Sequence, residues 1–140
     1  MVQVEDIVTT LQSDLELYRE VLELVEGETR ELSHGTGDMS RFEAARRELL
    51  PRLAGAVERM AALRQAWQAC DPARRSRHPE VGAFIHENQD LLMKAMVLDR
   101  ENEQELLRRG MVPVRDLPSV NRQRPHFVTD LYRRQGGRSV

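Results

Sequence analysis

The chain has 140 residues, enough for one small domain and a tail, and its formal net charge at pH 7 is -2. Hydrophobic residues make up 40% of the chain and aromatic residues only 4%, so the core must be mainly aliphatic and an all-β fold is not expected. The chain shows no apolar run of roughly 18 residues, no basic region in its first residues and a single cysteine, which predicts a cytoplasmic protein without membrane insertion or an internal disulfide.

The first expected element is a long helix over residues 3–33. Apolar residues recur there in alternating steps of four and three, the heptad row of a helix that packs on its neighbours. The row contains Val4, Val8, Leu11, Leu15, Tyr18, Leu22, Val25, Thr29 and Leu32. The row is widened by Ile7, Val21 and Leu24. We therefore expect this helix to face two partners and to end at the glycines of residues 35–37.

The second helix is expected to begin at Ser40, because Ser40 and Glu43 have the spacing of a capping box. Its apolar row contains Phe42, Ala45, Leu49, Leu53, Ala56, Met60, Leu63, Trp67 and Cys70. Two four-residue steps follow each other between Ala45 and Leu53, which indicates a slip in the heptad phase. Pro51 lies inside that slip and removes a backbone hydrogen bond. We predict a kink near residues 47–51 in a continuous helix.

The sequence Asp71-Pro72 is expected to end the second helix, and the basic stretch of residues 74–77 is expected to be a loop. A third helix should start near Pro79, which suits a first turn, and should close at Gly110. Its apolar row is interrupted by asparagines at positions 88 and 102, two heptads apart on one face. Such residues fix the register between helices or contact a partner, and the sequence favours the first role.

After Gly110 the pattern changes. Three prolines, at positions 113, 118 and 125, predict an irregular arm over residues 111–140 that ends in a short helix near Phe127, Leu131 and Tyr132. Residues 1–110 would then form the helical domain. The arm has a net charge of +4, from six arginines and two aspartates, but it carries no RNA-binding signature, which disfavours nucleic-acid binding. An arm packed on the bundle and a segment that docks on another protein are equal alternatives.

Motifs for chemistry are weak throughout the chain. The Glu31-x-x-His34 spacing of a di-iron bundle occurs once, where such a site needs it twice. Cys70 ends an apolar row, which predicts a buried side chain, and the acidic run from Asp99 to Glu105 alternates with Arg100, which predicts a solvated helix flank. We therefore expect no catalytic, metal or cofactor site.

The arrangement of these elements resembles the FlgN-type flagellar export chaperones. The residues that carry the resemblance lie mainly in the segment LQSDLELYREVLELVEGE, which begins at Leu11, and they are heptad leucines together with Tyr18 and Glu28. Leu32, Asp38 and the Leu49-Leu50 pair continue the pattern, and Asn88-x-x-Leu91-Leu92 is similar to the asparagine-plus-leucine signature of the family's later helix. The likeness spans roughly residues 8–108 and excludes the arm.

The expected elements predict an all-α antiparallel bundle of three long helices. The resemblance implies a small cytoplasmic, helical chaperone without cofactor. It implies binding to the C-terminal helical segments of hook-associated proteins and delivery to the export apparatus. The residues proposed to contact the partner are Met93, Met96, Met111, Phe127, Leu131 and Tyr132. Two alternatives remain open: a coiled-coil adaptor or assembly protein, including a homodimer closed by the same stripes, and a nucleic-acid-binding regulator that uses the basic arm.

Overall fold

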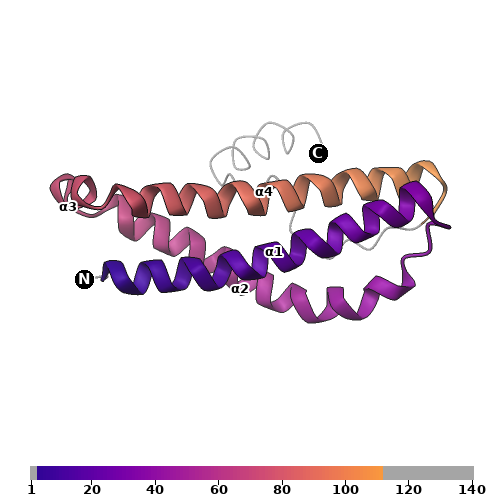
Figure 1. The fold of residues 1–140 in the computed structure, drawn as a ribbon, viewed down its shortest axis with the longest axis horizontal. Coiled ribbons are helices and arrows are strands. Elements are labelled where there is room, and N and C mark those ends of the chain that lie inside the picture. Colours follow the sequence, from indigo (N-terminus) through magenta and orange to yellow (C-terminus); the bar gives the residue numbers. More distant parts are fainter. Residues whose placement is uncertain (1–2, 112–140) are drawn as a thin grey trace, which may run out of the picture.

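The structure, a computed structural model, describes residues 3–111, and this part of the chain is helical without strands. Three long helices are present, α1 (Val4–His34), α2 (Glu43–Gln68) and α4 (Pro79–Arg108), together with the short α3 (Pro72–Arg77) (Figure 1). The prediction of an all-α protein with three long helices is thereby confirmed. The expected C-terminal arm and its short helix lie outside the described residues.

Helices α1 and α4 lie side by side along their length (Figure 1). Asn102 of α4 bonds to the carbonyl of Val25 and Arg109 bonds to the carbonyl of Leu32, so the residue numbers rise together and the two helices are parallel. In α2 the numbers run against α1: Arg46 meets Glu28, and Arg59 meets Asp14. The second helix therefore returns along the face of the first.

The core is a single cluster along the middle of α1. Tyr18 and Val25 are completely buried, and Leu11 is nearly so, in the central heptad line of that helix. The apolar rows of α2 and α4 close over this line. Their buried hydrophobic members are Leu49, Leu53, Ala56, Met60 and Trp67 of α2, and Val81, Ile85, Leu92, Ala95, Met96 and Leu106 of α4. As expected, the stripe of α1 serves two neighbouring helices.

The heptad slip predicted in α2 is wrong. The buried row passes through Arg46, which is only 4% exposed, and the steps from Arg46 to Leu49, Leu53 and Ala56 alternate between three and four without interruption. A row built from apolar residues alone contains Ala45 in place of its neighbour Arg46. Helix α2 continues through Pro51 without a break, and the kink near that residue stays a prediction.

The capping box expected at Ser40 is also wrong. Ser40 opens a 3₁₀ turn, Ser40–Phe42, and its N–H donates to the Oδ1 atom of Asp38 at 3.0 Å. No side chain caps the start of α2 at Glu43. The ring of Phe42 lies against Gly27 of α1, where a Cβ atom would approach it to 3.1 Å. The turn is thus shaped by packing on α1.

Helix α3 replaces the loop predicted for residues 74–77. The Asp71 carboxylate accepts a hydrogen bond from the N–H of Ala73 at 3.0 Å, and Pro72 occupies the first turn. These are ordinary helix-start signals, and the same residues also mark the expected end of α2. The limits expected for α4 are confirmed, because it starts at Pro79 and the chain leaves it at Gly110 with a φ of +76°.

Candidate protein-interaction surface

Helix α1 offers a different flank to each of its long neighbours. Residues seven apart share one side of a helix, and on one such line Asp14 and Glu28 bond to Arg59 and Arg46 of α2. On the opposite flank Thr29 donates to the Oδ1 atom of Asn102 in α4 at 2.9 Å. The α2-facing flank therefore contains buried acids, whereas the α4-facing flank is mainly aliphatic.

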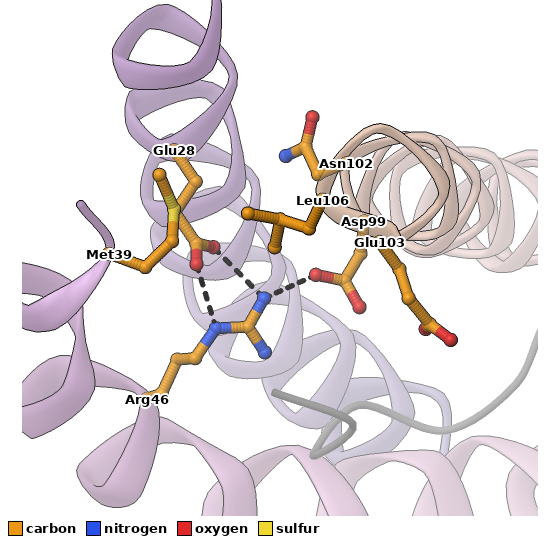
Figure 2. A pocket seen from close by; sticks show the side chains of 7 residues that line it. All are labelled: Glu28, Met39, Arg46, Asp99, Asn102, Glu103 and Leu106. Atoms are coloured by element: carbon orange, nitrogen blue, oxygen red, sulfur yellow. Dashed lines mark hydrogen bonds and ion pairs between the residues drawn. The ribbon is translucent and has the colours of Figure 1, made fainter. Parts of the chain in front are cut away.

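A buried ionic cluster joins all three long helices at the end of the bundle near the α1–α2 connection. Figure 2 shows the Arg46 guanidinium between two carboxylates, Glu28 of α1 and Asp99 of α4. The Nε and Nη2 atoms of Arg46 donate to the two Glu28 oxygens at 2.9 and 3.0 Å, and Nη2 also donates to Asp99. Each of these three residues is at least nine-tenths buried. This arginine connects α2 to both of its neighbours.

Burial and pairing oppose each other in this cluster. Burial is the largest influence on Glu28 and raises the pKa of its carboxyl group, although hydrogen bonding and attraction by Arg46 counteract it. Burial alone would lower the pKa of the Arg46 guanidinium, but the bonds and charges of Glu28 and Asp99 outweigh it, so that pKa is raised. The Nη1 atom of Arg46 is buried without a hydrogen-bond partner. The cluster is thus held by mutual pairing in a poorly solvated place.

The space beside this cluster is too small for a substrate. It is lined by Glu28, Met39, Arg46, Asp99, Asn102, Glu103 and Leu106 (Figure 2). Its volume is about 10 Å³, near the lower limit for one water molecule. Asp99 belongs to the core here, and the solvated flank predicted for it is wrong. We interpret the cluster as a structural feature that holds the three long helices together.

A second, more open hollow lies between α1 and α2 near Pro51, with a volume of about 190 Å³. Each of its charged groups has a partner of opposite charge. Arg59 donates to Asp14 at 2.8 Å, and Arg52 donates to the exposed Glu20 at 3.3 Å. The Arg59 pair explains how α1 buries the Asp14 carboxylate, which is 3% exposed.

The two asparagines of α4 have different roles. The Nδ2 atom of Asn102 donates to the Val25 carbonyl at 3.1 Å, and its oxygen accepts from Thr29, so this side chain links α4 to α1. Asn88 donates to Phe84 in its own helix, and its Oδ1 atom is buried without a partner. The contacts of Asn102 suit a residue that sets the register of α1 and α4.

The far flank of the α1–α4 pair is apolar. Asp99 and Glu103 mark the side of α4 that faces α2, and the heptad line four positions before Asn88 and Asn102 lies on its other side. That line and its counterpart on α1 consist of Phe84, Leu91 and Leu98 of α4 and Val8, Leu15 and Leu22 of α1. We name these six residues the outer seam. Within residues 3–111, α4 packs along α1 and, at its start, against the short α3. No third long helix covers the seam in this part of the chain.

The outer seam is still partly accessible. Val8, Phe84, Leu91 and Leu98 are half-buried and pack at the margin of the core, whereas Leu15 and Leu22 are buried. A flank of this kind is an edge on which one more amphipathic helix can pack. The α1 half of the seam could be predicted from the sequence as part of the wide apolar stripe on that helix. That the seam is left uncovered follows only from the position of α2 on the other flank.

The structure does not bring the predicted contact residues together. Met96 lies in the core with 2% exposure, which contradicts its assignment to a partner surface. Its heptad position places it on the α2 side of α4, where the helices pack. Met93 is half-buried off the outer seam, and Met111 is 36% exposed next to Gly37. Phe127, Leu131 and Tyr132 lie outside the described residues.

The described residues do not suggest a metal site or a membrane-spanning helix. Within residues 3–111 no group of three His, Cys, Asp or Glu side chains is placed to hold a metal ion. None of the helices in this part of the chain is both long and apolar enough to cross a bilayer. Comparison with known proteins found no match among family models, curated proteins or solved structures.

Proposed function

We propose that this protein is an export chaperone of the flagellar type, which binds the C-terminal helical segments of hook-associated proteins in the cytoplasm and hands them to the export apparatus. The proposal combines the resemblance of residues 8–108 to FlgN-type chaperones with one structural observation, the outer seam. A chaperone for a helical segment needs a long apolar surface without a deep pocket, and the seam is such a surface.

The seam has the spacing that a helical client needs. Phe84, Leu91 and Leu98 repeat every seven residues, so they match a client stripe with apolar residues at i, i+3, i+4 and i+7. From Phe84 to Leu98 the seam extends about 21 Å at a rise of ~1.5 Å per residue. A client that is unstructured before it binds must order several turns, and that entropy cost keeps the complex releasable.

Binding of full-length protein to a synthetic C-terminal peptide of a hook-associated protein from the same cell, measured by titration calorimetry, tests the function. We expect binding to an amphipathic peptide and none to a scrambled peptide of equal composition. Absence of binding to the C-terminal segment of every hook-associated protein of that cell would refute the proposal.

Two adjacent residues provide a matched test of the site. Leu98→Gln places an amide on the seam, whereas Val97→Gln changes an exposed side chain, 41% accessible, on another face of α4. We expect Leu98→Gln to weaken client binding at least about 10-fold, the equivalent of roughly 1.4 kcal/mol, and Val97→Gln to leave it unchanged. Circular dichroism of both variants serves as the control that they remain folded. Equal client affinity of the two variants would show that the client does not bind at the seam.

A further inference from the structure

The charged residues beside the outer seam are mainly acidic. On each helix the next heptad line outward, three or four residues from the seam, is polar. These residues are Glu5, Gln12, Arg19 and Glu26 on α1, and Glu80, Glu87, Lys94 and Glu101 on α4. Five acids against two bases give this rim a net charge of -3. The surface thus selects for an apolar stripe with cations on both sides.

The chain itself contains such a segment. Residues 112–140 carry six arginines and two aspartates, a net charge of +4. Within it, Phe127 and Leu131 are four residues apart, as are Val128 and Tyr132, which is the spacing of neighbours on one side of a helix. Arg124 and Arg134 flank this apolar group. The composition of the segment is complementary to both the seam and its rim.

The connection is long enough for the segment to return. The described chain ends at Met111, three residues past α4. The 16 residues from there to Phe127 can span up to about 50 Å when extended. The 24 residues of α4 from Arg108 back to Phe84 measure about 36 Å. Phe127 can therefore reach any level of the seam from the end of α4.

We propose that residues 112–140 fold back along α4 and seat Phe127 and Leu131 on the outer seam, with the arginines of the segment against the acidic rim. The occupant of the seam in the free protein is then the protein's own C-terminal segment. The segment covers the surface assigned to the client, so a client has to displace it. The apparent affinity of the client is therefore reduced in proportion to the fraction of molecules whose seam is free. This consequence for the client rests on the proposed function; the docking itself does not.

Photo-cross-linking of the full-length chain tests the docking without any client. Phe127 is replaced by p-benzoylphenylalanine, the protein is irradiated at low micromolar concentration, and the monomer fraction is digested and mapped by mass spectrometry. We expect cross-links to peptides that contain residues 84–98. The same photoreactive group in place of Ser139, near the chain end and outside the apolar group, should give at least fivefold fewer of these links.

Charge reversal on the rim provides the second arm of the test. Glu87→Lys together with Glu101→Lys changes two exposed residues, so the fold should persist, as circular dichroism will verify. We expect the yield of seam cross-links to fall at least threefold in this variant, and to fall likewise at high salt.

The outcomes separate the two proposals. Cross-links found only in dimers would assign the seam to a second copy of the chain and overturn the docking, as would links confined to other surfaces or a yield that ignores the rim charges. If the chain cross-links as expected but binds no hook-associated peptide, the proposed docking is supported and the proposed function is refuted. If the chain binds the peptide but gives no seam cross-links, the proposed function is supported and the proposed docking is refuted.

Discussion

Replacing Arg46 by methionine should destabilise the bundle strongly. The methionine can occupy much of the space of the arginine stem but leaves the carboxylate of Glu28, 4% exposed, without the donor that occupies both of its oxygens. Removing one partner of a buried ion pair costs about 3–5 kcal/mol, because the remaining charge is neither solvated nor paired. We expect a loss of this size at pH 7.

The pH dependence gives an independent estimate of the same loss. A buried carboxyl group without a partner can take up a proton, and relative to an unfolded pKa of roughly 4.3 this costs about 3.7 kcal/mol at pH 7 and about 1 kcal/mol at pH 5. The burial that already raises the pKa of Glu28 acts in this direction, and loss of Arg46 removes the groups that lower it. Because the folded variant binds the extra proton, its stability falls as the pH rises.

Urea unfolding at pH 7 and pH 5, followed by circular dichroism and by the fluorescence of the single tryptophan, Trp67, measures both effects. Arg52→Met is the matched control, because Arg52 forms its ion pairs at the exposed surface, and it should cost less than about 1 kcal/mol. The triple variant Glu28→Leu, Arg46→Met, Asp99→Leu should recover most of the stability. A loss below about 1 kcal/mol for Arg46→Met, or a loss that is equal at both pH values, would refute this account of the cluster.

Three further outcomes are expected. Asn102→Ala should lower the free energy of unfolding by about 1–3 kcal/mol and Asn88→Ala by less, since only Asn102 bonds across to α1; equal losses in urea unfolding would contradict a register role. Pro51→Ala should stabilise α2 by about 1–3 kcal/mol, measured by thermal unfolding, because it restores an N–H in the helix interior, and a destabilised variant would show that the backbone there requires proline. Arg108 and Arg109 hold the pKa of Glu105 at about 2, so its stabilising effect should disappear as the pH falls from about 4.3 toward 2. Glu105→Gln should flatten acid unfolding in that window, and an unchanged acid profile would show that the exposed pair contributes nothing.

Much of the helical framework could be predicted from the pattern of residues. The limits of α1 and α4 followed from apolar periodicity, a proline at a helix start and glycines at helix ends, all of which act within a few residues along the chain. Two of the errors came from polar residues with buried roles. Arg46 and Asp99 interrupt apolar rows, so hydrophobicity alone predicts a heptad slip at the first and solvent exposure at the second.

The three long helices, and the faces of them that must be covered, could be predicted from the residue pattern because helix signals and heptad spacing are local; the short α3 was missed. Three features follow only from the packing of the helices: α2 covers the acidic flank of α1, one arginine compensates carboxylates from two other helices, and the α1–α4 flank keeps an open edge. These features depend on contacts between residues 18 to 77 positions apart. Whether a charge is buried is set by the partner that packing brings to it, and the local pattern does not contain that information.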